Sequence, residues 1–322
     1  MKYNKFPGTN LTVSAMCLGT MTFGGQANAK DSTEMMRYAF DNGINFFDTA
    51  NIYCQGESEK IVGKALKPMR DDVILATKLG GKLGDGLNAE GLSRYNIIRS
   101  AEASLKRLDT DYIDLYYMHV PDKDTSFDET MEAMSRLVSD GKIRYIGVSN
   151  HAAWQMAEMN SICESNHFCK PSMTQNVYNL LTRGLEGELL PFIQKNKIGL
   201  AVYNPLAGGL LTGKHQGNVP AQDSRFDREK GYYDRYFNEK NLNAVSQLTE
   251  IATRFDTDML SLAINWCASK AYVTTSILGC SKLSQLEQNI KLFGTLEITK
   301  EIEDACDQVW LDISGARFPY CR

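Results

Sequence analysis

The sequence has 322 residues, of which 43% are hydrophobic and 23% charged, and its formal net charge is −4 with a pI of ≈ 5.7. This composition is ordinary for a folded protein. The chain has only 8 prolines, and this low content excludes a long disordered tail. The acidic balance argues against nucleic acid as the main partner, because phosphate binding requires a basic face.

The protein is expected in the cytosol, away from membranes. Its N-terminus lacks the apolar core of a signal peptide, and no run of about 18 apolar residues occurs that could cross a bilayer. The cysteines form no CxxC pair, and several lie inside apolar runs, as reduced thiols do. They are Cys17, Cys54, Cys163, Cys169, Cys267, Cys280, Cys306 and Cys321.

Short apolar segments recur along the chain. Residues 1–12, with Gly8 and Asn10 as turn residues, predict a hairpin that covers one end of the fold. The following segments have the length and composition of buried strands. They are Val13–Leu18, Ile44–Phe47, Val73–Thr77, Tyr112–Met118, Ile143–Val148, Ser172–Thr174, Ile198–Val202 and Val273–Leu278.

Between these segments, apolar residues recur at helical spacing. A capping box at Asp31 predicts a helix over Met35–Asp41, and Ser126 with Glu129 caps a helix that ends near Ser139. Ser58 opens another helix, and the polar stretch 216–240 reads as a loop. Further helices are expected over Arg94–Leu108, Trp154–Glu164, Leu189–Lys195, Leu242–Phe255 and Met259–Ser269.

Eight strand–helix alternations predict parallel strands joined by right-handed crossovers, and eight parallel strands can close into a barrel. We therefore predict an α/β fold of the (β/α)₈ TIM-barrel class, as a single domain over residues 1–322. In addition to the barrel, we predict an N-terminal hairpin, and a long loop with an extra helix before strand eight. The alternative is a doubly wound open sheet, but Gly19-Thr20-Met21 after the first strand does not match GxGxxG.

In a barrel all strand ends lie on one face, where active sites assemble. Asp48, Lys78 and His119 follow the second, third and fourth strands, and Tyr53 lies in the loop after Asp48. A tyrosine has a pKa of about 10, but a nearby ammonium such as Lys78 lowers it, with Asp48 as the counter-ion. With His119 orienting a carbonyl oxygen, these residues predict carbonyl reduction with Tyr53 as the acid. Taken alone, Asp48 and Lys78 would also suit an ordinary ion pair.

The chain has no hydride source of its own, so reduction implies a nicotinamide cofactor. Ser149, Asn150 and Gln175 offer groups that suit a carboxamide, and Tyr203 offers a flat face for the ring. The run from Gly279 to Lys282 opens the last helix, where backbone N–H groups and the Lys282 ammonium suit a phosphate. The adenosine end would lie against the polar side chains that recur at helical spacing just beyond, Gln285, Gln288 and Asn289.

Five motifs in this order resemble the aldo-keto reductase family, and most closely the branch that contains bacterial members and potassium-channel β subunits. They are residues 43–66, 119–122, 147–150, 175–180 and 203–210. The resemblance implies a tetrad of Asp48, Tyr53, Lys78 and His119, a small-molecule carbonyl substrate, and NADPH (NADP⁺ after reaction) extended across the C-terminal face of the barrel.

The resemblance also implies which residues hold the cofactor. They are Gly19, Thr20, Met21, Asp48, Ser149, Asn150, Gln175, Tyr203, Asn204, Pro205, Leu206, Gly208, Lys214, Arg225, Gly279, Ser281, Lys282, Gln285, Gln288 and Asn289. Ser281 stands where this branch often has a basic residue, which leaves Lys282 to meet the 2′-phosphate. NADPH is expected ahead of NADH.

Two other motifs are rejected. Residues 208–214 match GxxxxGK, but His215 replaces the Ser or Thr that would hold Mg²⁺, so we expect a turn there. Cys163, His167 and Cys169 fit no zinc spacing, and no metal is expected.

Two functions remain open, an NADPH-dependent carbonyl reductase and an NADPH-binding regulatory or interaction protein that turns over slowly. The stretch 216–240, with Arg225, Phe226 and three tyrosines, is expected to fold over cofactor and substrate.

Overall fold

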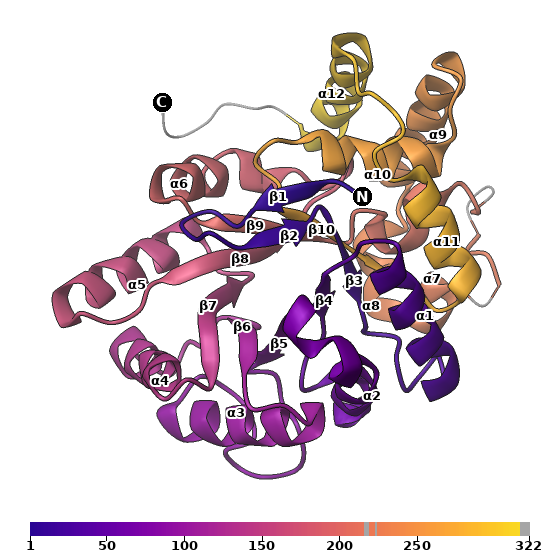
Figure 1. Cartoon of the computed structure of the whole chain (residues 1–322). Helices are drawn as coiled ribbons and strands as arrows, with labels where there is room; N and C mark the ends of the chain where they lie inside the picture. Colours follow the sequence, from indigo (N-terminus) through magenta and orange to yellow (C-terminus); the bar gives the residue numbers. More distant parts are fainter. Residues whose placement is uncertain (216–218, 223, 316–322) are drawn as a thin grey trace.

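The computed structural model describes residues 1–215, 219–222 and 224–315. Eight strands, each parallel to its neighbours, close into a barrel in the order β10-β3-β4-β5-β6-β7-β8-β9 (Figure 1). Their bounds are β3 (Met16–Gly19), β4 (Phe46–Asp48), β5 (Ile74–Leu79), β6 (Ile113–Met118), β7 (Ile143–Ser149), β8 (Pro171–Val177), β9 (Gly199–Tyr203) and β10 (Thr275–Gly279). The predicted TIM-barrel class is confirmed.

An antiparallel hairpin of β1 (Tyr3–Lys5) and β2 (Thr12–Ser14) covers one end of the barrel (Figure 1). Asn4 Nδ2 donates to Thr274 O just before β10, which places the hairpin at the N-terminal ends of the strands. The predicted hairpin is confirmed, but it includes Ser14 and the residue before it, which the sequence assigned to the first barrel strand. The Ser14 N–H is instead satisfied by Asn45 Oδ1 at 2.7 Å, and the barrel strand begins at Met16.

Helices surround the barrel (Figure 1). Their bounds are α1 (Ala29–Asp41), α2 (Glu57–Leu66), α3 (Arg94–Leu108), α4 (Phe127–Ser139), α5 (Ala153–Asn166), α6 (Leu189–Asn196), α7 (Arg225–Arg228), α8 (Lys230–Tyr236), α9 (Glu239–Arg254), α10 (Met259–Ser269), α11 (Leu283–Leu292) and α12 (Lys300–Ser314). Four 3₁₀ segments join them among the described residues, η1 (Tyr53–Gly56), η2 (Lys67–Asp72), η3 (Gly184–Glu186) and η4 (Ala207–Thr212).

Several helix starts differ from the prediction. α1 begins before the expected capping box because Asn28 Oδ1 accepts from Asp31 N at 3.0 Å and caps an additional helical turn. α2 begins at Glu57, so Ser58 lies inside the helix and does not open it. The helix after Lys282 is not the last one, since α12 follows it.

The stretch 216–240 is largely helical, which corrects the prediction of a loop. Residues 216–218 and 223 lie outside the described part of the chain, but α7, α8 and the start of α9 occupy most of the remainder. Phe226 and Tyr236 are buried, and the Phe226 ring lies 5.4 Å from that of Phe237 and 5.1 Å from that of His215. Burial of these aromatic rings gives the segment a core of its own, because large apolar side chains dominate the energy of local packing.

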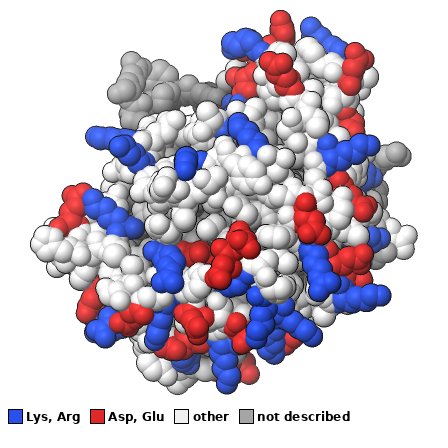
Figure 2. Space-filling model, viewed as in Figure 1, with Lys and Arg blue, Asp and Glu red and all other residues white. Residues whose placement is uncertain are grey.

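Two apolar cores support the barrel. One lies between the helices and the outside of the strands, and the other fills the interior, where Phe6 of the hairpin connection packs with Cys17, Phe46 and Tyr117. On the face with the hairpin, acidic and basic side chains are interspersed around the rim (Figure 2). Within the described residues, no helix has both the length and the apolar character needed to cross a membrane.

Candidate active site

A cavity of about 640 Å³ opens at the C-terminal ends of the barrel strands. It brings together most of the residues that the sequence placed at this face. Those that line it are Gly19, Thr20, Met21, Asp48, Tyr53, His119, Ser149, Asn150, Gln175, Tyr203, Asn204, Arg225 and Gly279. A largely apolar hollow with convergent polar groups at this end of a barrel is the usual form of an enzyme site.

Lys78 lies on β5 beside this cavity, with its side chain fully buried. Its ammonium donates to the Asp48 carboxylate, to Thr49 O at 2.7 Å and to Tyr53 Oη at 3.2 Å. All three ammonium donors are therefore used, and one of them is directed at the phenol. Asp48 also accepts from Gln175 Nε2 at 2.8 Å, so its two oxygens are both held.

The pKa of Tyr53 is shifted in the direction opposite to the prediction. Enclosure raises the pKa of the Tyr53 phenol and outweighs the Lys78 ammonium, which lowers it, so that the net shift is upward. Burial likewise lowers the pKa of Lys78, but Asp48 and Tyr53 together raise it above its ordinary value. At neutral pH the phenol keeps its proton beside a charged ammonium, and the expected net lowering of the Tyr53 pKa is not found.

His119 completes the group. Its ring lies edge-on to that of Tyr53 with centroids 6.0 Å apart, and its Nδ1 is buried without a partner among the described residues. Burial, and then the charge of Lys78, lower the pKa of His119 to about 3. The imidazole is therefore neutral at physiological pH, and it can hydrogen-bond an oxygen without competing with Tyr53 as an acid.

The backbone around Asp48 is fixed by a cluster of buried hydroxyl groups. Ser58 Oγ lies 2.9 Å from both Thr20 Oγ1 and Thr49 Oγ1, and Thr20 Oγ1 donates to Asp48 O at 3.0 Å. The Ser58 hydroxyl is thus engaged in this cluster from inside α2 and does not cap the helix. The cluster fixes the strand end that carries the carboxylate and the carbonyl to which Lys78 donates.

A tight turn after Tyr53 sets the direction of the phenol. Cys54 and Gln55 have positive φ values of 47° and 56°, and Gly56 has a φ of 91°. Two non-glycine residues in the left-handed region are uncommon, and such conformations persist where the surrounding structure enforces them. At Gly56 a Cβ would lie 2.9 Å from Arg107 Cδ, so glycine is required there on both counts.

The residues expected to hold a carboxamide form a network. Ser149 Oγ donates to Gln175 O at 2.8 Å, and Asn150 Nδ2 donates to Ser149 Oγ and to His119 O, both at 3.1 Å. Tyr203 Oη donates to Asn150 Oδ1 at 2.7 Å. These side chains therefore form a fixed polar wall next to His119.

One further polar group on the cavity wall is available to a bound molecule. Asn204 lines the wall and has φ 54°, and its Nδ2 is buried with no partner among the described residues. An unsatisfied buried amide is costly unless a bound group accepts from it. Beyond it the predicted turn is the segment η4, and Lys214 extends back beside Gly209.

Several predicted cofactor residues do not line the cavity. Pro205 and Leu206 lie on the connection from β9 into η4, Gly208 lies inside η4, and Lys282 is the exposed N-cap of α11. Ser281 N donates to Gln285 Oε1 at 2.9 Å, and Asn289 Nδ2 contacts Cys280 Sγ. Gln285 thus accepts from the backbone just before its own helix, and both Gln285 and Gln288 are exposed. The adenosine contacts of this helix stay a prediction.

The cavity also contains residues that the sequence reasoning missed. They are Thr22, Gly25, Gln26, Ile52, Cys54, Glu229, Tyr232, Arg235 and Ile277. Those from α7 and α8 carried a signal, because Arg225, Glu229, Tyr232 and Arg235 recur every three or four residues, as one face of a helix does. This helical spacing was not recognised because the stretch 216–240 was interpreted as a loop.

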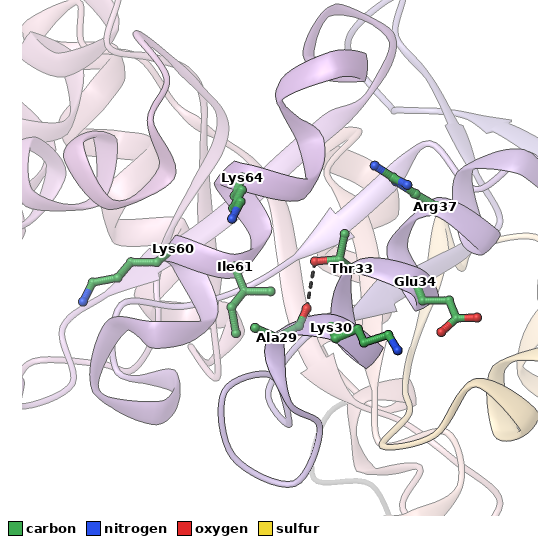
Figure 3. Close-up of a pocket in the computed structure, with 8 residues that line it drawn as sticks. All are labelled: Ala29, Lys30, Thr33, Glu34, Arg37, Lys60, Ile61 and Lys64. Carbon is green, nitrogen blue, oxygen red and sulfur yellow. Dashed lines mark hydrogen bonds between the residues drawn. The ribbon is translucent and has the colours of Figure 1, made fainter.

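A second hollow of about 780 Å³ lies outside the barrel between α1 and α2 (Figure 3). Its charged residues, Lys30, Glu34, Arg37, Lys60 and Lys64, are all exposed, and Lys60 is paired with Glu57 at 2.6 Å. Figure 3 shows Lys30 and Lys60 extending away from each other. No buried polar group converges there, so the larger hollow is a surface groove and the smaller one is the candidate site.

Within the described residues, no group of three or more His, Cys, Asp or Glu side chains is placed to hold a metal ion. Cys163 and Cys169 are linked instead by a contact from the thiol to the backbone, Sγ to O at 3.5 Å.

The cavity, its polar tetrad and the barrel define an oxidoreductase of the TIM-barrel type, and comparison with known proteins agrees. The sequence model of the Aldo/keto reductase family matches residues 15–311. The chain is 37% identical to a probable voltage-gated potassium channel subunit beta of Oryza sativa subsp. japonica, over 96% of each chain. It is 36% identical to the aldo-keto reductase YhdN of Bacillus subtilis, over 99% of this chain and 97% of that protein.

A third relative is the L-glyceraldehyde 3-phosphate reductase of Escherichia coli O157:H7, 34% identical over 96% of this chain and 92% of that protein. This chain belongs to the aldo/keto reductase family, as its motifs predicted. The family typically uses NADPH or NADH.

Proposed function

We propose that this protein reduces an aldehyde or ketone to an alcohol with NADPH, and that Tyr53 is the general acid. The observation that carries the proposal is the buried chain of contacts at the cavity, in which Asp48 holds Lys78 and Lys78 donates to Tyr53 Oη at 3.2 Å. An ion pair with a purely structural role would not need its third hydrogen bond to be directed at a phenol on a cavity wall.

Bound NADPH would supply the hydride that adds to the carbonyl carbon. Tyr53 Oη then gives its proton to the carbonyl oxygen, and Lys78 stabilises the phenolate that remains. Asp48 keeps Lys78 charged and in position, since burial alone would favour the neutral amine. His119, neutral at physiological pH, orients the carbonyl oxygen.

The polar wall of the cavity supports this cofactor. Asn204 offers an amide nitrogen with no partner in the described part of the chain, and Tyr203 offers its ring. Arg225 lies at the cavity and Lys214 beside the glycine turn of η4, where both cations suit the pyrophosphate. Lys282 at the start of α11 suits the 2′-phosphate, because a cation there adds to the favourable field of a helix N-terminus.

A second function is favoured by the relative named as a potassium channel subunit. In that case the chain would bind NADPH and regulate or contact a partner, with slow turnover. A steady-state assay of NADPH oxidation with a chemically diverse set of aldehydes and ketones separates the two. Sustained turnover supports the reductase, and bound cofactor with negligible turnover supports the regulatory protein.

Replacing Lys282 by Glu is expected to weaken NADPH binding selectively. The change sets a like charge beside the 2′-phosphate and should cost roughly 1–3 kcal/mol, the range for a charge-assisted contact. Fluorescence titrations with NADPH and with NADH measure the effect. Lys291→Glu, the same charge change at the exposed far end of α11, is the matched control. Equal weakening of both cofactors by the Lys282 variant would place the 2′-phosphate elsewhere.

NADPH binding is expected to protect the segment 225–236 from hydrogen exchange. Arg225, Glu229, Tyr232 and Arg235 line the cavity, so a bound cofactor would contact α7 and α8 and restrain their opening. Hydrogen exchange with and without NADPH is the measurement, and α12, which contributes nothing to the cavity, is the internal reference. Unchanged protection across 225–236 would contradict the expected closure over the cofactor.

A further inference from the structure

Two guanidinium groups lie at the cavity. Arg225 of α7 and Arg235 of α8 both line it, and both lie against the ring of Tyr232, at 4.8 and 5.4 Å from its centroid. Among residues 1–215, 219–222 and 224–315, no carboxylate forms an ion pair with either. The third cation of the site, Lys78, is already neutralised by Asp48. Glu229 also lines the cavity, but it is one carboxylate against two guanidinium groups, so the cavity keeps a net positive charge.

The two arginines serve different parts of the cavity. Arg225 lies near Lys214, since its charge adds to burial in lowering the pKa of that lysine, and Lys214 lies beside Gly209 of η4. Arg235 lies near Tyr203, where its charge opposes the effect of burial, which raises the pKa of the Tyr203 phenol to about 12. Arg225 thus lies near the glycine turn that suits the cofactor phosphates, whereas Arg235 lies near Tyr203.

Tyr203 in turn is connected by hydrogen bonds to His119 of the proposed catalytic tetrad. Tyr203 Oη donates to Asn150 Oδ1 at 2.7 Å, and Asn150 Nδ2 donates to His119 O at 3.1 Å. Tyr232 lies against the Arg235 guanidinium, and both Tyr232 and Tyr53 line the same cavity. Arg235 therefore lies near the polar groups that are proposed to receive the carbonyl.

We propose that the cavity selects carbonyl substrates that carry an anionic group, a carboxylate or a phosphate, and that the Arg235 guanidinium binds this group. The inference rests on the reductase function proposed above and specifies its substrate class. Tyr232 restrains the guanidinium through its ring, and the planar fork of donors matches both anions. A neutral substrate of the same size would leave this charge unpaired, so the anion is preferred.

The test compares aldehydes that differ in charge and little else. The carboxylate pair is 4-oxobutanoate and its methyl ester, and the phosphate pair is glycolaldehyde phosphate and glycolaldehyde. Each is assayed with the full chain and NADPH, for the wild type, Arg235→Gln, Arg235→Lys and Arg254→Gln. Arg254 is the matched control because it also lies over an aromatic ring, that of Phe255 at 5.3 Å, and does not line the cavity.

We expect the wild type to prefer the anionic member of at least one pair, and the preferred pair identifies the anion. Arg235→Gln should lower kcat/KM for that anionic aldehyde by about tenfold or more, the effect of losing one charge-assisted contact, chiefly through KM. The neutral aldehyde and the Kd of NADPH should change less than about twofold, as for a contact made only to the anion. Arg235→Lys should retain part of the preference.

Three results overturn the inference. If charged and neutral aldehydes are reduced equally well by the wild type, the reductase function stands and the substrate class is wrong. If Arg235→Gln weakens NADPH binding as strongly as it affects the anionic aldehyde, Arg235 belongs to the cofactor site. If no carbonyl compound is reduced while NADPH binds, the reductase function fails together with the inference.

Discussion

Replacement of Tyr53 by Phe is expected to lower turnover by about 10²- to 10⁴-fold, the usual worth of general acid catalysis. The change removes one oxygen and leaves the ring, so the packing against His119 and the Lys78 ammonium is preserved. NADPH binding should persist, because the groups that suit the cofactor lie on other strand ends. Steady-state turnover with a reactive aldehyde, together with a titration of NADPH, measures the effect.

The matched control for this variant is Tyr95→Phe, which removes the same oxygen from an exposed tyrosine on α3. It should leave turnover and cofactor binding unchanged. If Tyr53→Phe keeps nearly wild-type turnover with the cofactor bound, the phenol is structural, and the regulatory function becomes the better account of the site.

Replacement of Lys78 by Met should abolish most of the turnover and also destabilise the fold. Lys78 is completely buried and is the ion-pair partner of Asp48, which would keep only Gln175 Nε2 and lie buried as an uncompensated charge. Breaking a buried pair on one side costs about 3–5 kcal/mol of unfolding free energy. Denaturant unfolding gives the stability, and the aldehyde assay gives the activity.

A double variant separates the two effects. Lys78→Met combined with Asp48→Asn removes the stranded charge, so much of the lost stability should return while activity stays low. An activity that recovers with stability would mean that Lys78 acts only through folding. A Lys78→Met variant of wild-type stability would contradict the geometry of the buried pair.

Local patterns were sufficient to predict the barrel. The helices α3 and α10 have the bounds that their apolar spacing predicted, because amphipathic periodicity is a property of the segment itself. Most strand ends were also readable, since the apolar runs stop at polar or glycine residues, but β5 continues through Lys78 to Leu79 and β8 continues through Gln175 to Val177. Once eight parallel strands close, Asp48, Lys78 and His119 must share one face, so their convergence with Tyr53 followed from topology.

Properties that depend on tertiary contacts could not be predicted. The net rise in the Tyr53 pKa results from enclosure, which a sequence does not display, and it outweighs the Lys78 ammonium that the sequence does display. Arg235 and Glu229 recur at helical spacing in the sequence, but their position at the cavity depends on the burial of Phe226 and Tyr236, which a sequence does not display. The contacts of Gln285 with Ser281 and of Asn289 with Cys280 are likewise tertiary details that their helical spacing does not display, and their cofactor role stays a prediction.

The central claim is that Tyr53 and Lys78 serve hydride transfer to a carbonyl, and single-turnover reduction with NADPH deuterated at the transferred position tests it most directly. We predict that deuterium appears on the carbinol carbon of the alcohol in the wild type, and that Tyr53→Phe with NADPH bound transfers it at least about 10²-fold more slowly. Bound NADPH that stays unoxidised by any aldehyde, or equal transfer by wild type and variant, would contradict the claim.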